Sequence, residues 1–200
     1  METAEEIMKQ TYEKAKAFFK VDLPVYKLNI IKDKAEMYND EIKTTKWQGA
    51  GFFRKNAVFI MDKSFFKDLG YKEDEFEGVI VHELSHIFIK QIVKEFIPIW
   101  IEEGLCNHIG FPNIKLKPKE IINLEKIITS EDWYENNTPF VYCTYLFRVL
   151  SEDYGNEKIL EFIKKLNIKG VKEAFLEVFE MPLNEFINKI NSNIQNDKFT

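Results

Sequence analysis

The chain has 200 residues, of which 45% are hydrophobic and 14% aromatic, and this is enough for one domain with a sizeable core. Its formal net charge of -5 argues against nucleic-acid binding, because proteins that bind a phosphate backbone usually gather a basic patch. No apolar run reaches the roughly 18 residues that a membrane-spanning helix needs, since charged residues and Pro98 interrupt the stretch from 87 to 101. The composition therefore favours a soluble globular protein without membrane insertion.

The amino terminus and the cysteines indicate the compartment. The first residues are acidic and lack the basic region and the apolar core of a secretion signal. The two cysteines, Cys106 and Cys143, are too few for a disulfide framework, and we expect both to be reduced. We therefore expect a cytoplasmic protein, whose oligomeric state the composition leaves open.

The first third of the chain has the pattern of an α+β lobe. Thr3 and Glu6 form a capping-box pattern before an apolar stripe with helical spacing, which predicts a helix up to about Lys20. The segments that follow are predicted to be a strand at 25–31, a short helix at 34–42 and a hairpin of strands at 49–53 and 57–61. We therefore expect a small antiparallel sheet in this lobe.

The rest of the chain is predicted to be helical. A helix that starts at Glu73 is apolar around most of its circumference, so we expect it to be buried, with Gly78 allowing another backbone to approach closely. Pro98 ends this helix, and a second helix runs from 100 to 109. Further helices are predicted at 118–128, 139–154, 156–170, 171–179 and 183–193, with Asn156 capping the third of these.

The helix from Glu73 contains the sequence His82-Glu83-Leu84-Ser85-His86, which uses two of the three histidines in the chain. Residues four apart on a helix lie on the same face, so His82 and His86 can bind one metal ion. Glu83 lies about 100° further around the helix, beside that metal. A zinc-bound water has a pKa of about 7, and a neighbouring carboxylate can take its proton as the water attacks a carbonyl. The pattern predicts a zinc hydrolase with Glu83 as general base; the alternative is two histidines held by unrelated hydrogen bonds.

A catalytic zinc usually takes three protein ligands, so a third one has to be found. A histidine six residues after His86 is excluded, because Ile92 occupies that position. The remaining histidine, His108, is better explained as a surface or capping residue than as a ligand. Cys106 is also a poor candidate, because the residues near it in the chain include a better zinc ligand. Carboxylates are left as the source of the third ligand.

The segment Pro98 to Leu105, Pro-Ile-Trp-Ile-Glu-Glu-Gly-Leu, resembles the P-x-W-[LI]-x-E-G-[LF] element of gluzincin metallopeptidases, which include thermolysin-like enzymes and zinc aminopeptidases. The resemblance implies that Glu103 is the third zinc ligand, that Glu102 is a surface or rim charge, and that Gly104 lets the second helix pack close to the first. Glu103 follows His86 at a slightly shorter spacing than in the aminopeptidases, as in compact bacterial members of the peptidase MA-like type.

The resemblance extends beyond this element. The stretches 145–155, 174–175 and 183–186 are similar to the helical tail of those compact proteins. A zincin-like fold is therefore implied for a single domain at 1–200. In that fold an α+β lobe at about 1–72 and a mainly helical lobe at about 73–200 meet at a cleft that contains the active-site helix.

Three further roles are expected from chemistry and from the family. A donor must stabilise the oxyanion, and in this family a tyrosine or histidine of the carboxy-terminal lobe often does so. Tyr142 and Tyr145 are therefore candidate catalytic residues, although core packing explains each of them at least as well. Gluzincins hold an extended substrate against an edge strand, and 49–51 is either that edge or a packed hairpin strand. Asn107 stands where thermolysin-like enzymes carry an aspartate that orients a ligand histidine, and it either has this role or is a helix-surface asparagine.

The expected function is hydrolysis of peptide bonds in a peptide or protein substrate by one zinc ion and Glu83. Endopeptidase action is favoured, because no GAMEN-type amine-binding sequence is found near 49–50. One alternative is a non-catalytic module with the same fold that binds a metal or a protein partner, although such a module has no chemical need for Glu83. Another alternative is a zinc hydrolase that acts on non-peptide amides.

Overall fold

A computed structural model describes residues 3–23, 27–33, 50–54, 57–113, 117–129, 133 and 139–196. These residues divide into two compact units, one made of Met1–Phe88 with Ile109–Phe111 and the other of Ile89–His108 with Pro112–Thr200. The first unit has α+β structure, and the second is helical among its described residues. No helix in the described part of the chain has the length and apolarity needed to cross a membrane.

Helix α1 (Ala4–Phe19) opens the first unit and begins at the predicted capping box. The Thr3 hydroxyl accepts a hydrogen bond from the Glu6 backbone N–H at 3.2 Å, and the Glu6 carboxylate accepts one from the Thr3 backbone N–H at 2.8 Å. The helix ends at Lys20, whose φ of 56° places it in the left-handed region typical of a helix C-terminus. The prediction for this helix is confirmed.

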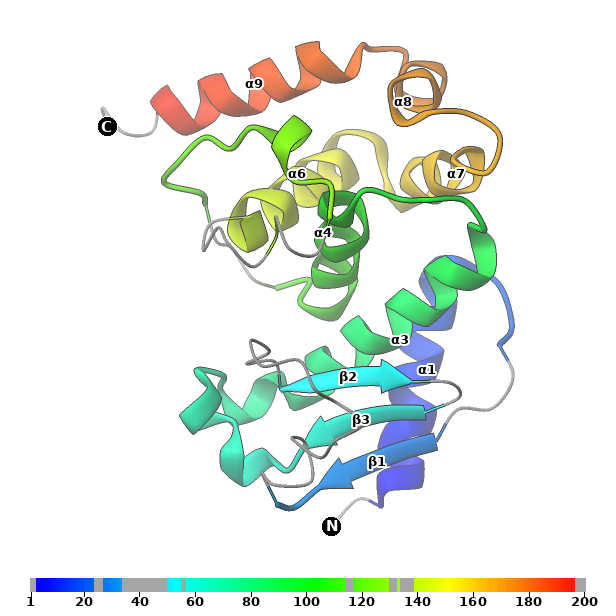
Figure 1. Ribbon diagram of the computed structural model, residues 1–200, viewed down its shortest axis with the longest axis vertical. Coiled ribbons are helices and arrows are strands. Elements are labelled where there is room, and N and C mark those ends of the chain that lie inside the picture. Colours follow the sequence, from blue (N-terminus) through cyan, green and yellow to red (C-terminus); the bar gives the residue numbers. More distant parts are fainter. Residues whose placement is uncertain are drawn as a thin grey trace. The chain divides into compact units, whose positions relative to one another are not determined.

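The sheet of the first unit has three strands, β1 (Lys27–Ile31), β2 (Gly51–Arg54) and β3 (Ala57–Met61), in the order β1-β3-β2 (Figure 1). The predicted hairpin of β2 and β3 is confirmed as an antiparallel pair. The prediction of a wholly antiparallel sheet is wrong, because β1 pairs with β3 in parallel. The second strand of the hairpin, β3, lies between β2 and β1, and β3 runs in the same direction as β1. The short helix predicted at 34–42 lies outside the described residues.

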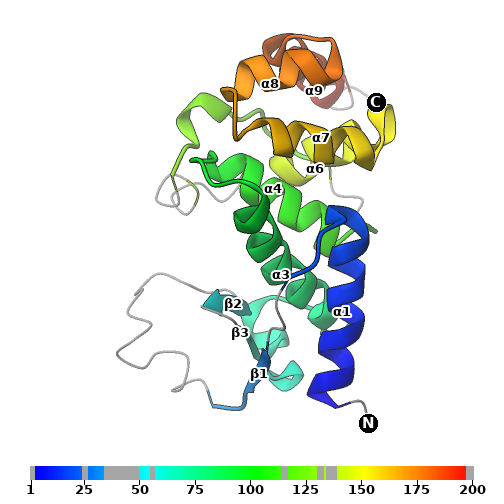
Figure 2. The ribbon, with the colours of Figure 1, turned by 90° about the vertical axis from the view of Figure 1, so that its right-hand side faces the viewer.

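Helices α1 and α3 (Phe76–Ile92) cover one face of this sheet (Figure 2). The two helices contact each other through Phe19 and Phe88, whose rings stack with centroids 5.1 Å apart. Beneath them, Val58 and Ile60 of β3 are fully buried. The residues Glu73–Glu75, predicted as the start of the long helix, form a 3-10 turn instead, and the α-helix begins at Phe76.

The second unit contains five helices among its described residues: α4 (Ile99–Gly110), α6 (Pro139–Tyr154), α7 (Asn156–Lys165), α8 (Val171–Phe179) and α9 (Leu183–Asn196). Their bounds agree closely with the predicted ones, except that α7 ends earlier. Gly155, with a φ of 80°, separates α6 from α7 and takes the capping position that was predicted for Asn156. Phe175 and Phe179 form an aromatic core here, with ring centroids 4.5 Å apart.

The prediction of a helix at 118–128 is wrong. Only Leu124–Lys126 form a short 3-10 turn, and the described residues before it have no regular structure. The Asn123 side chain accepts a hydrogen bond from the Glu125 backbone N–H at 3.0 Å, and such a bond offers the backbone an alternative to a helix. The segment is nevertheless fixed, because the Ile99 backbone N–H donates to the Ile128 carbonyl at 3.0 Å and Leu124 is buried.

Candidate metal centre

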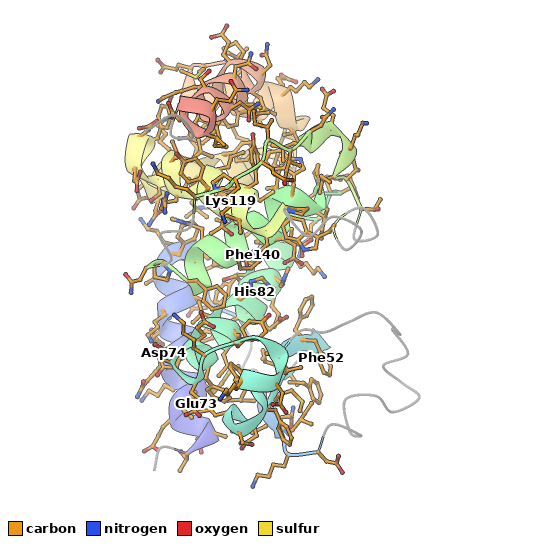
Figure 3. The ribbon with its side chains drawn as sticks, turned by 90° about the vertical axis from the view of Figure 1, so that its left-hand side faces the viewer. Phe52, Glu73, Asp74, His82, Lys119 and Phe140 are labelled. Atoms are coloured by element: carbon orange, nitrogen blue, oxygen red, sulfur yellow. The ribbon has the colours of Figure 1, made fainter. Side chains whose placement is uncertain are left out.

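Helix α3 brings His82 and His86 together on one face, as the spacing of four predicts. Their Nε2 atoms are 3.1 Å apart, and His86 is only 6% exposed. Figure 3 shows His82 along α3, beyond Glu73 and Asp74 at the turn that leads into the helix. Two imidazole nitrogens this close can share a proton or bind the same cation.

Glu83 is buried on the same helix, with an exposed fraction of 6%. Strand β2 lies directly against it, since a Cβ added at Gly51 would be 2.9 Å from Val79 Cγ1 and 3.3 Å from Glu83 Cγ. Of the strands that the structure describes, β2 is at one edge of the sheet. Glu83 is therefore a buried carboxylate that directly follows a candidate metal ligand in the chain.

Two glycines fix the end of α4 against α3. A Cβ at Gly78 would lie 2.8 Å from the Gly110 carbonyl oxygen, and a Cβ at Gly110 would lie 2.6 Å from the Gly78 carbonyl oxygen and 3.1 Å from His82 Cβ. Real Cβ atoms do not tolerate such distances, so both positions need glycine. The prediction that Gly78 admits a second backbone is confirmed, and this contact reaches the backbone that carries His82.

Gly104 has a different contact from the one that the resemblance implied. The atoms nearest to a Cβ at this position belong to α6, namely Phe147 Cδ2 at 2.9 Å and Cys143 Cβ at 3.0 Å. Gly104 therefore admits α6, and the close approach to α3 is made by Gly110. Glu103 precedes Gly104 in the chain, so it lies next to the close contact between α4 and α6.

His82, His86 and Glu103 form a group that could hold a metal ion. One possible ligand atom from each lies within 4.8 Å of the others. Ligand atoms bound at about 2.1 Å in a tetrahedron are about 3.4 Å apart, so the widest separation would have to shorten by at most about 1.4 Å. Two imidazoles and one carboxylate fit a divalent cation and leave a coordination position for water or substrate.

The other candidate ligands do not belong to this group among the described residues. Glu102 is 4.0 Å from Lys90 Nζ, which agrees with the predicted rim position. His108 Nε2 is 3.3 Å from Asn156 Oδ1, and burial lowers the pKa of His108. Cys106 is fully buried and reduced.

Asn107 is fully buried, so the alternative of a helix-surface asparagine is wrong. Neither its Oδ1 nor its Nδ2 atom has a hydrogen-bond partner among the described residues. An amide buried without partners is destabilising by about 1–3 kcal/mol. The amide oxygen therefore makes no hydrogen bond to a histidine in this structure, and a role of Asn107 in orienting a ligand histidine stays a prediction.

The two tyrosines of α6 have different surroundings. The Tyr142 hydroxyl donates to Asn191 Oδ1 of α9 at 2.7 Å, and burial raises the pKa of Tyr142. Tyr145 is 7% exposed, and its ring lies under the Arg148 guanidinium, with 4.9 Å between Arg148 Cζ and the ring centroid. The bond to Asn191 favours a structural role for Tyr142, and the oxyanion role of either tyrosine stays a prediction.

The sequence patterns missed two neighbours of the histidine pair. Gly110 was interpreted only as the end of a helix, and Phe53, whose ring lies against His86, was interpreted only as a strand residue. The Gly78 to Gly110 contact had a partial signal, a glycine inside an apolar helix. The contact of Phe53 had none, because it depends on how β2 is placed against α3.

Comparison with protein-family models, with curated proteins and with solved structures finds no match to the chain.

Proposed function

We propose that the chain is a zinc-dependent peptidase in which His82, His86 and Glu103 hold the metal and Glu83 is the general base. The observation that carries this proposal is the group of three ligand atoms within 4.8 Å of one another, with a buried glutamate next to His82 in the chain. Two histidines and a glutamate are a donor set that suits catalytic zinc. A zincin-like fold is part of the same proposal.

Zinc at this position would supply Lewis acidity, which polarises a carbonyl and lowers the pKa of a bound water to about 7. Glu83 takes the proton of the attacking water and gives it to the leaving amine nitrogen. Its burial suits this task, because it keeps the carboxylate out of bulk water, and the residue before it in the chain is a proposed metal ligand. Glu83 alone can therefore carry out both proton transfers, first as the general base and then as the general acid.

The edge strand β2 supports a peptide as the substrate. An extended peptide can pair with an exposed strand edge through main-chain hydrogen bonds, and Gly51 of β2 lies beside Glu83. A peptide paired with this edge would have its backbone carbonyls near the general base. This argument favours a peptide over a small non-peptide amide. Cleavage within a chain is favoured by the sequence alone, since no GAMEN-type sequence is found near 49–50.

The test compares the wild type with Glu83→Gln in metal content and in cleavage of a peptide library followed by mass spectrometry. We expect about one equivalent of zinc in both proteins and cleavage that is at least about 1,000-fold slower in the variant. Glu102→Gln is the matched control and should cleave at the wild-type rate. Full activity of Glu83→Gln would remove the assignment, whereas zinc binding without any cleavage by the wild type would indicate a non-catalytic module.

A further inference from the structure

We infer that Phe53 of β2 is a positioning residue that holds the His86 imidazole in the orientation for metal binding. This inference rests on the proposed metal site. The centroid of the Phe53 ring is 5.4 Å from that of His86, and the two planes are inclined by 23°. The contact is therefore an offset stack, a favoured arrangement of two aromatic rings.

The stack constrains the histidine in the way that metal binding requires. A ring that contacts the face of the imidazole restricts rotation of the imidazole plane and leaves the in-plane nitrogens unobstructed. His86 Nε2 lies 3.1 Å from His82 Nε2, which is the edge where a shared metal would bind. Hydrogen-bonded partners that orient a ligand histidine typically contribute 10- to 100-fold to metal affinity, and we expect the stack, which also orients the ring, to contribute within this range.

Phe53 is itself held by the sheet. It pairs with Val58 of the central strand, and Val58 is fully buried. Two residues earlier on the same strand face, Gly51 lies against Val79 and Glu83, where a Cβ would be too close. Strand β2 therefore contacts α3 at two points, through Gly51 and Phe53, and its pairing with β3 holds it there.

The two contacts on β2 match the two functional positions on α3. Gly51 and Phe53 are two apart on a strand and so share a face, while Glu83 and His86 are three apart on a helix and are also neighbours on its surface. One strand thus fixes the general base at one point and a metal ligand at the other. A packing role alone would need an apolar side chain at position 53 but no aromatic face.

Phe52 provides a matched control. It is adjacent in the chain, and Figure 3 shows it on the side of the sheet away from α1. Its ring stacks on Phe59 of β3 with centroids 4.8 Å apart and planes inclined by 2°. Loss of either phenylalanine removes one aromatic stack from the same strand, but only loss of Phe53 removes a contact with a histidine.

The experiment measures Co²⁺ binding by visible absorption, and zinc affinity by competition, in the wild type, Phe53→Leu, Phe53→Tyr and Phe52→Leu. We expect Phe53→Leu to bind about 10- to 100-fold more weakly and to alter the Co²⁺ spectrum. Phe53→Tyr keeps the aromatic face and should retain the wild-type affinity and spectrum, as should Phe52→Leu. If Phe53→Leu does not fold, Phe53→Met, which preserves volume without a ring, replaces it.

Each outcome decides the question. Wild-type affinity and spectrum in Phe53→Leu would overturn the inference and leave the proposed function intact. Equal weakening in Phe52→Leu would also overturn it, because the effect would then come from the strand in general. A wild-type protein that binds neither Co²⁺ nor zinc would instead refute the proposed metal site, and the inference with it.

Discussion

Ionisable side chains gather in two very different parts of this molecule. One is the candidate metal centre on α3, and the other is a network of lysines and glutamates on α7, on α8 and in the segment between them. In the network, Lys169 Nζ is 2.6 Å from Glu177 and 2.9 Å from Glu173, and these side chains are 32% to 65% exposed. At the centre, His86 and Glu83 are each 6% exposed. The network balances its own charge in contact with water, whereas the centre combines two imidazoles with carboxylates, for which a divalent cation is the natural counterion.

The difference teaches where a functional explanation is needed. Exposed ion pairs contribute little to stability and are screened by salt. A small contribution to the stability of α7 and α8 therefore suffices to explain the network. The centre is a different case, because its buried His86 belongs to a group of ligand atoms that could hold a metal ion, and the buried Glu83 lies on the same helix. If the centre binds a metal, changes there should alter metal binding and activity strongly, and changes in the network should alter neither.

The largest expected effect comes from comparing alanine variants of two adjacent glutamates, one in the candidate metal centre and one at its rim. Glu103→Ala should lower zinc affinity by more than about 100-fold, because it removes a ligand rather than a group that only orients one. Glu102→Ala should change affinity less than about threefold, since its carboxylate lies beside Lys90 at the rim. Competition with a chromogenic chelator measures both. The reverse result would exchange the two assignments.

Metal removal should separate the two regions by stability. Zinc at about 100 times its Kd stabilises a protein that binds it only when folded by about 2.7 kcal/mol. We expect the thermal midpoint of the wild type to rise on addition of zinc to protein treated with a chelator. His86→Ala should show no rise, whereas Glu177→Gln should show the full one. An equal rise in His86→Ala would place the metal elsewhere.

Close packing at the glycines offers a third test. Gly110→Ala should destabilise the protein by about 2 kcal/mol, because the added Cβ would meet the Gly78 carbonyl oxygen at 2.6 Å and His82 Cβ at 3.1 Å. The shift of the adjacent His82 backbone should also weaken zinc binding. Gly170→Ala is the control, since no atom lies within 4 Å of a Cβ there. Urea unfolding measures both variants, and equal stability of the two would show that the α3 backbone yields easily at this contact.

The sequence patterns were most successful where the evidence is local. The spacing of His82 and His86, the capping box at Thr3, and the helices bounded by Pro139 and Gly155 all follow from neighbouring residues, and the structure confirms them. The resemblance at Pro98 to Leu105 selected Glu103 over Glu102, and Glu103 is the one that lies in the group with the histidines.

Most of the failures depend on information that is distant in the chain. The direction of β1 relative to β3 is set by strand order, which a strand pattern does not contain. The contact of Phe53 with His86 and that of Gly104 with α6 depend on how elements pack. The wrong helix after Pro118 has a local cause, the hydrogen bond from the Asn123 side chain, which competes with helix formation and was overlooked.

The smallest expected effect belongs to the network. Hydrogen bonds from Lys165 and Lys169 lower the pKa of Glu177 to about 2, from an ordinary value of 4.5. Because the folded state holds this proton less readily than the unfolded state, Glu177 stabilises the fold above about pH 4.5 and loses that contribution as the pH falls towards 2. Glu177→Gln should therefore lower the thermal midpoint near neutral pH by no more than about 2 °C, a small effect because the side chain is 42% exposed.

Two controls isolate this contribution. The difference between wild type and Glu177→Gln should shrink as the pH is lowered to about 2.5, and it should also shrink in about 0.5 M salt, which screens exposed charges. Zinc affinity and peptide cleavage should be the same in both proteins, since none of the network residues belongs to the metal-binding group in the described part of the chain. A difference that persists at low pH and high salt would mean that Glu177 acts by packing rather than by charge, and the contrast between the two regions would then rest on burial alone.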